Sequence, residues 1–251
     1  MFSRNTFLFI FINLISFYSF SQSIKIAAID WCPQICVNED NSGYTVDLIN
    51  KVFENSPYKI EIDILPWSRG LKYVLEGKYD ALLAPAKKEA PLLKYPTFAV
   101  GQQRMCFFTD VENEWEYTGE ASLSNKHFGI ASDSSIEELN PYIEKHPRQF
   151  QFQPYHERYV VQNAQKVKKG RIDAFLFTKN TTQYTLKKSG LDGLFKNSGC
   201  VSQADIYLAF TPIASQEELI AKVILMFDSR MASLIQSGYV EQLYKQYQIN
   251  N

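Results

Sequence analysis

A seven-residue segment at the junction between a helix and a strand occurs twice in this chain. Gly77-Lys78-Tyr79-Asp80-Ala81-Leu82-Leu83 is echoed 93 positions later by Gly170-Arg171-Ile172-Asp173-Ala174-Phe175-Leu176. In each copy the Gly can end a helix in the left-handed conformation, the Asp can hold the turn, and the Ala is small enough for the strand to pass beneath a helix. Short echoes also arise by chance, but here the helical and strand patterns match on both sides. The chain is therefore predicted to form two similar lobes.

The apolar pattern around the first copy alternates between strand and helix. Residues 24–29 form a short apolar run, and apolar residues at 48, 49, 52 and 53 share one helical face. Residues 58–64 alternate between apolar and polar, which is typical of a strand with one buried face. A helix that opens at Pro66 and ends at Gly77 leads to a strand over 79–84. This order predicts a mainly parallel sheet covered by helices.

The second copy lies in the same setting. Strands are predicted over 128–131, 150–152 and 172–177, and a helix over 160–167. Ser134 and Glu137 have the spacing of a capping box at the start of a further helix. A strand over 206–210 and two helices separated by Gly238 complete the chain. The predicted fold class is α/β with two lobes.

The first 23 residues have the order of a secretory signal peptide. Arg4 is followed by an apolar run over 7–20 and then by Ser21 and Ser23, which predicts cleavage before Ile24, with cleavage before Gln22 as the alternative. A retained anchor is the other interpretation, but a run of about 14 residues is shorter than the roughly 20 that span a bilayer. We therefore expect export to the periplasm.

The charge balance excludes some partners. Removing Arg4 from 26 basic residues leaves 25 against 27 acidic ones, a net charge of −2 for the exported part. This balance gives no electrostatic reason to expect nucleic acid or an anionic membrane as a partner. A monomer without a cofactor is expected.

All four cysteines lie in the exported part, where disulfides can form. Four cysteines allow three pairings. Cys32 and Cys36 have neither the spacing of a redox pair nor a second pair nearby for zinc, so a local bridge is predicted. Cys106 then pairs with Cys200.

Several motifs, each weak alone, occur in a specific order. They are the segment 43–48 (Gly-Tyr-Thr-Val-Asp-Leu), the two Gly-x-x-Asp-Ala junctions, 128–130 leading to Ser134-Ser135, and the C-terminal segments 237–239 and 243–247. In these features nearly the whole exported chain resembles the periplasmic solute-binding proteins of polar amino acid ABC importers, which have the type II flytrap fold. The resemblance implies a discontinuous lobe 1 (24–105 and 207–251), a lobe 2 (106–206), and hinge strands near 105–109 and 206–210.

Ligands of open α/β sheets bind beyond the carboxyl ends of the strands, which selects the candidate binding residues. Trp67 can stack on a ligand or anchor a core, and Arg69 can bind an anion or face solvent. The serines at 134 and 135 can offer helix N–H groups to an anion or simply cap the helix. The candidates are Asp30, Trp31, Trp67, Arg69, Pro85, Lys87, Lys88, Ser134, Ser135, Tyr155 and Thr178.

The chain departs from this family at both anchors for a zwitterion. The family's Thr-x-x-Arg segment, which holds the ligand carboxylate, corresponds to Ala86-Lys87-Lys88-Glu89, and the Asp that holds the ammonium corresponds to Thr178. A lysine can replace the Arg only as a less directional charge. We therefore expect a small polar or anionic ligand, one that can carry a ring for a Trp face, and not a standard α-amino acid.

The sequence favours binding over catalysis. The three histidines show no metal-ligand spacing, and no phosphate loop or nucleophile elbow occurs. An ABC permease is the expected partner, and a membrane receptor that senses occupancy is the alternative. Some proteins of this fold are dehydratases, so a periplasmic enzyme is the third possibility.

Overall fold

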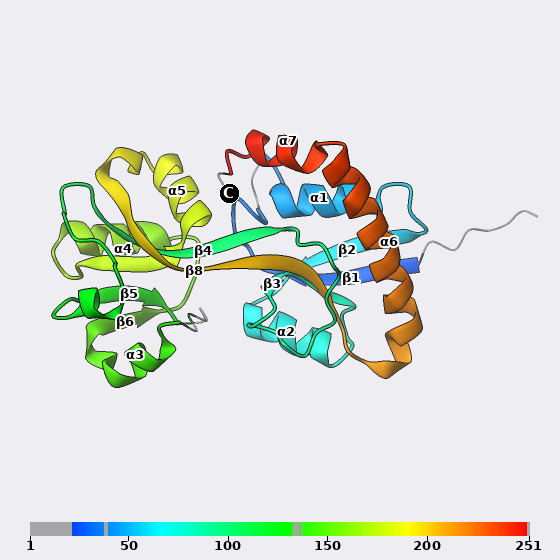
Figure 1. Ribbon diagram of the computed structural model, residues 1–251, viewed down its shortest axis with the longest axis horizontal. Coiled ribbons are helices and arrows are strands. Elements are labelled where there is room, and N and C mark those ends of the chain that lie inside the picture. The colour runs from blue at the N-terminus through cyan, green and yellow to red at the C-terminus, as the bar shows by residue number, and fades with distance from the viewer. Residues whose placement is uncertain (1–21, 38–39, 133–135, 137, 250–251) are drawn as a thin grey trace, which may run out of the picture.

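The two copies of the strand–helix–strand pattern form the two ends of one long sheet (Figure 1). The computed structural model describes residues 22–37, 40–132, 136 and 138–249. The strand order is β2-β1-β3-β8-β4-β7-β5-β6. Residues 1–21 of the predicted signal peptide and the capping box of Ser134 and Glu137 fall outside the described residues, whereas Gln22 and Ser23 already belong to the first strand.

The first end of the sheet consists of β1 (Gln22–Ala28), β2 (Tyr58–Ile64) and β3 (Ala81–Ala86), and β1 is parallel to both neighbours. Parallel neighbours need a crossover, which α1 (Tyr44–Phe53) and α2 (Trp67–Leu75) provide. Figure 1 shows α1 and α2 on opposite faces of these strands. This is the predicted arrangement.

The other end repeats it. β5 (Phe128–Ala131) is parallel to both β6 (Phe150–Gln153) and β7 (Ala174–Thr178), so it holds the place that β1 holds in the first end. The helices here are α3 (Asn140–Lys145), α4 (Tyr159–Lys168) and α5 (Lys179–Lys188). The prediction of two similar α/β lobes is confirmed.

Two long strands run from one lobe to the other (Figure 1). β4 (Gly101–Asp110) and β8 (Phe195–Phe210) are antiparallel to each other; β8 also pairs with β3, and β4 with β7. The Cys106–Cys200 disulfide joins these two strands, and Cys32–Cys36 closes a loop after β1, so both predicted bridges are confirmed.

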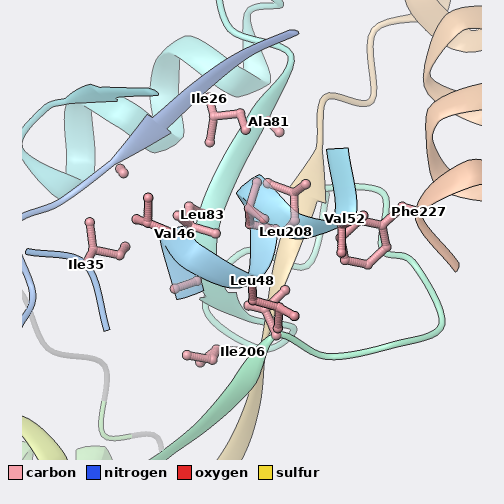
Figure 2. Packing of buried hydrophobic residues seen from close by; sticks show 14 of the residues in the cluster. Ile26, Ile35, Val46, Leu48, Val52, Ala81, Leu83, Ile206, Leu208 and Phe227 are labelled. Carbon is pink, nitrogen blue, oxygen red and sulfur yellow. The ribbon is translucent and has the colours of Figure 1, made fainter. Parts of the chain in front are cut away.

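The C-terminal helices cover the first lobe. α6 (Glu217–Gln236) and α7 (Tyr239–Gln246) meet at Gly238, whose φ of 74° is left-handed. Figure 2 shows the core beneath them, where Leu48 and Val52 of α1 lie near Leu208 of β8 and Phe227 of α6. The chain thus returns to lobe 1 after building lobe 2.

The core clusters divide in the same way. Two clusters take their buried side chains from 24–100 and 206–249. The other two take theirs from 105–195. Each lobe therefore has its own core, with β4 and β8 between them.

Four elements differ from the sequence predictions. The helix predicted to start at Ser134 begins only at Asn140, as α3, and the described residues 136, 138 and 139 before it are not helical. β8 begins at Phe195, far before the predicted start at 206, and α5 was not predicted at all. The side chains of β2 are only half buried because β2 is an edge strand of the sheet. Short 3₁₀ turns occur at Glu120–Leu123, Pro147–Gln149, Asp192–Leu194 and Ala214–Gln216.

Among the described residues, we find no helix with the length and apolar content that a bilayer crossing requires.

Candidate functional site

A cavity of about 490 Å³ lies where the two lobes face each other. Residues of both lobes and of the connecting strand β4 line it. From lobe 1 they are Ile29, Asp30, Trp31, Ile64, Leu65, Pro66, Trp67, Leu83, Ala84 and Glu89; from β4, Gln103 and Met105; from lobe 2, Tyr155, His156, Glu157, Phe177 and Thr178.

The topology explains why these residues meet. Asp30 follows β1, Trp67 opens α2 just after β2, and Tyr155 follows β6. Thr178 is the last residue of β7. The parallel strands of each lobe point their carboxyl ends toward the other lobe, so their following loops converge on one cavity.

Five of the sequence-predicted binding residues line this cavity together. They are Asp30, Trp31, Trp67, Tyr155 and Thr178. Three come from lobe 1 and two from lobe 2. The strand-end rule therefore selected side chains that are far apart in the sequence and that the fold brings together.

Four other candidates do not line the cavity. Arg69 is exposed on α2, and Pro85 is buried in β3. The Lys87 ammonium lies over the Tyr207 ring at 4.7 Å from its centre, and Lys88 pairs with Glu138 at 3.7 Å. The cations expected to contact an anion thus lie elsewhere. Ser134 and Ser135 fall outside the described residues.

Trp31 connects the lobes at one side of the cavity. Its side chain is buried, and the indole N–H donates to Thr178 Oγ1 at 3.2 Å. Nearby, Gln34 Nε2 donates to Thr181 Oγ1 at 3.3 Å. These two hydrogen bonds join the loop after β1 to β7 and α5, so the described conformation has the lobes in contact here.

Tyr155 contributes an aromatic surface from lobe 2. Its ring stacks on Phe177 with 5.0 Å between centres. Burial, and secondarily the charge of Asp30, raise the pKa of Tyr155. The hydroxyl therefore stays protonated and can donate a hydrogen bond at any physiological pH.

Glu89 is one of the lining residues that sequence reasoning missed; Gln103, His156, Glu157 and Phe177 are others. Its Oε2 accepts the Ala86 N–H at 2.9 Å, and its Oε1 accepts from Gln103 Nε2 at 3.1 Å. The carboxylate is half buried in the cavity wall. The pKa of Tyr95 is raised mainly by the burial of Tyr95 itself and secondarily by the charge of Glu89. Its sequence signal is the acid that ends the segment 86–89, in the turn after β3.

The lining is acidic. Asp30, Glu89 and Glu157 contribute three carboxyl groups, while His156 is the one side chain in the described lining that can carry a positive charge. Lysine and arginine are absent from this described lining. The remaining surface is largely apolar and aromatic.

Ala84 gives the cavity wall an unusual backbone. Its φ of 69° is left-handed, and the pairing of β3 with β8 shifts register between Leu83 and Ala86. A non-glycine residue in this conformation costs roughly 1–2 kcal/mol. Such strain often lies beside binding sites, because the surrounding fold maintains it there.

Within the described part of the chain, no group of three or more His, Cys, Asp or Glu side chains is arranged to hold a metal ion. The cavity lining offers hydrogen-bonding, charged and aromatic groups.

This chain matches known proteins in structure but not in sequence. No protein-family model matches the chain, and no curated protein matches it by sequence. Many solved structures match, including a histidine kinase sensor domain with similarity to periplasmic binding proteins (15% identity, TM-score 0.72, covering 91% of this chain and 97% of the other).

Two further solved structures that match are of amino-acid-binding proteins. The probable amino-acid ABC transporter extracellular-binding protein ytmK from Bacillus subtilis is 19% identical, with a TM-score of 0.71 over 91% of this chain and 98% of that one. The ancestral amino acid-binding protein AncCDT-1, described as a precursor of cyclohexadienyl dehydratase, is 12% identical, with a TM-score of 0.66 over 90% and 95%. The chain therefore has the two-lobe fold of the periplasmic solute-binding proteins.

Proposed function

We propose that this protein is a solute-binding protein that captures a small ligand between its lobes and presents it to an ABC importer in the membrane. The observation that carries the proposal is the cavity, which both lobes line and whose volume of about 490 Å³ suits a small metabolite. A site divided in this way can be completed only when the lobes approach each other.

The division into lobes and the mechanism of closure are part of the proposal. Lobe 1 comprises residues 24–105 and 207–251, and lobe 2 comprises 106–206. The separate cores and the two connecting strands support this division. A ligand that contacts both lobes stabilises the closed state, because it binds that state more tightly than the open one.

Export to the periplasm is part of the same proposal. Residues 1–23 act as the signal peptide in this proposal, and the mature monomer works in the periplasm. Disulfides suit an oxidising compartment, and two are present.

A sensory function is the second candidate, since one of the matched structures is a histidine kinase sensor domain. The same closure would then report occupancy to a receptor. Gene neighbourhood separates the two: an adjacent permease and ATPase favour import, and an adjacent kinase or cyclase favours sensing.

Catalysis is not part of the proposal. One matched protein is the ancestor of a dehydratase, so the fold itself is compatible with turnover. The proposal predicts that a bound ligand is recovered unchanged after long incubation, as measured by mass spectrometry. Conversion of the ligand would replace the binding proposal with an enzymatic one.

Small-angle X-ray scattering tests the binding function directly. With a saturating ligand, found first by thermal shift against a metabolite panel, the radius of gyration should fall. Thr178→Val, which removes the acceptor for the Trp31 indole N–H, should weaken closure. Thr185→Val, at a half-buried position of α5 outside the described cavity lining, should not. An unchanged scattering profile at saturation would contradict capture by closure.

A further inference from the structure

We infer that the ligand of this cavity is an organic cation: an amine or guanidine compound with a flat or apolar body and no carboxylate. This inference rests on the proposed binding function and defines its ligand class. The sequence led us to expect a small polar or anionic ligand, and this inference excludes the anionic alternative.

The first argument is the charge of the wall. Three carboxyl groups, those of Asp30, Glu89 and Glu157, face a cavity whose described lining contains no lysine or arginine. An anion would have to leave water and lie among like charges, and both effects oppose binding. A cation in the same place exchanges its hydration for charge-assisted hydrogen bonds, which are the stronger kind.

The second argument is the position of two of these carboxylates. Glu89 is oriented by the Ala86 N–H and by the Gln103 amide, each donating to a different oxygen. Asp30 accepts the Val37 N–H at 3.2 Å, and its charge reaches Tyr155 of the other lobe. These bonds fix the orientation of both carboxylates in the cavity wall.

The third argument is the aromatic content of the wall. Trp31, Trp67, Tyr155 and Phe177 line the cavity from both lobes. Aromatic rings attract cations to their faces, and they also stack against planar apolar groups. Carboxylates together with aromatic rings therefore suit a positively charged group attached to a flat or apolar body.

The same wall disfavours an ordinary α-amino acid. Its carboxylate would need a positively charged partner, and His156, an exposed residue, is the one such group in the described lining. A buried charge without a partner is costly. The decarboxylated relative of an amino acid avoids this cost while keeping the amine and the side chain.

Matched pairs of compounds test the inference. We would titrate the mature protein by calorimetry with agmatine and arginine, histamine and histidine, and tryptamine and tryptophan, and with indole-3-acetate as an anion. At least one amine should bind, and its amino acid and the anion should bind at least tenfold more weakly. Raising the salt concentration should weaken the amine, because its attraction to the wall is electrostatic.

Variants identify the carboxylate responsible. Glu89→Gln keeps the size of the side chain and removes its charge, and should weaken the amine at least tenfold. Glu114→Gln removes the same charge from an exposed position outside the cavity and should leave affinity unchanged. Thermal unfolding checks that both variants fold, and Glu157→Gln, at an exposed position of the wall, provides a second test if Glu89→Gln does not fold.

The outcomes separate the two proposals. If an amino acid or an organic acid binds with compaction while no amine binds, the cation inference is wrong and the binding function stands. The inference is also overturned if an amine binds but its affinity is unaffected in Glu89→Gln, Glu157→Gln and Asp30→Asn alike. If no compound of the amine, amino acid and organic acid panels binds or compacts the protein, both proposals fail together.

Discussion

In each lobe, an equivalent aspartate of the repeated segment joins the third strand to the first. In lobe 1, the Lys25 N–H donates to Asp80 Oδ2 at 2.7 Å, and the Asp80 N–H donates to the Lys25 carbonyl at 2.9 Å. In lobe 2, the His127 N–H donates to Asp173 Oδ2 at 2.7 Å, and the Asp173 N–H donates to the His127 carbonyl at 2.8 Å. Each aspartate thus closes a ring between adjacent parallel strands.

The surroundings of the two aspartates differ. Gln216, in the segment after β8, donates to Asp80 at 3.4 Å, and burial raises the pKa of Asp80. Asp173 instead lies 3.9 Å from the Lys126 ammonium and is partly open to solvent. The difference arises because the chain returns to lobe 1 and covers its junction. A local motif can therefore be repeated while its energetic setting is not.

The largest expected effect concerns the two disulfides, since one joins the connecting strands and the other closes a local loop. Replacing Cys106 and Cys200 with Ser releases a loop with a sequence separation of 94. Chain entropy then predicts a loss of about 4–5 kcal/mol in the free energy of unfolding. Removing Cys32 and Cys36, which are separated by 4, should cost only about 2 kcal/mol on the same basis.

Urea unfolding of both double variants measures this difference. Each should be compared with the oxidised wild type at the same protein concentration. Equal losses from the two pairs would show that strain or residual structure, and not loop length, determines what each bridge contributes.

The next effect tests whether the two aspartates are equivalent. Asp80→Ala and Asp173→Ala each leave a strand N–H without its charged acceptor, and each should lower the free energy of unfolding by about 2 kcal/mol. Chemical denaturation, followed by probes in each lobe, would measure both losses. A loss confined to one variant would mean that the repeated motif stabilises only one lobe.

A smaller effect should distinguish the two glycines. Gly77 and Gly170 have φ values of 71° and 62°, so alanine costs roughly 1 kcal/mol at either position. A Cβ at Gly77 would also lie 2.9 Å from Ile213 Cγ1, whereas at Gly170 it would meet nothing within 4 Å. Gly77→Ala should therefore lower the melting temperature more than Gly170→Ala, and the reverse order would contradict the comparison.

The smallest effect is a pH dependence that arises from Asp80 in lobe 1. Since burial raises the pKa of Asp80 in the folded state, the protonated form is favoured there more than in the unfolded chain. The contribution of Asp80 to stability is therefore full below its unfolded pKa of about 3.9 and is lost as the pH rises through the raised value.

Asp80→Asn removes this titration. The stability of the wild type relative to Asp80→Asn should thus fall as the pH rises from about 4, as measured by urea unfolding at several pH values. A constant difference between the two proteins across that range would contradict the proposed effect of burial.

The sequence by itself determined the local structure and the general position of the site. Short apolar runs, the alternation over 58–64 and helical periodicity identified β1, β2, β5 and most helices, because these patterns are properties of short segments. The repeated junction predicted two lobes, and the strand-end rule selected Asp30, Trp31, Trp67, Tyr155 and Thr178, which share one cavity.

Only the tertiary structure decided the rest. The first half of β8 is polar and irregular in sequence, and its pairing with β4 makes it a strand. α5 has few apolar residues, so its packing against lobe 2 and not its pattern defines it. Lys87, Lys88 and Glu89 lie in the turn after β3, where Glu89 lines the cavity, Lys87 lies over the Tyr207 ring and Lys88 pairs with Glu138. The charge of the site was therefore not readable from the segment, because the backbone path decides which of three adjacent side chains faces the ligand.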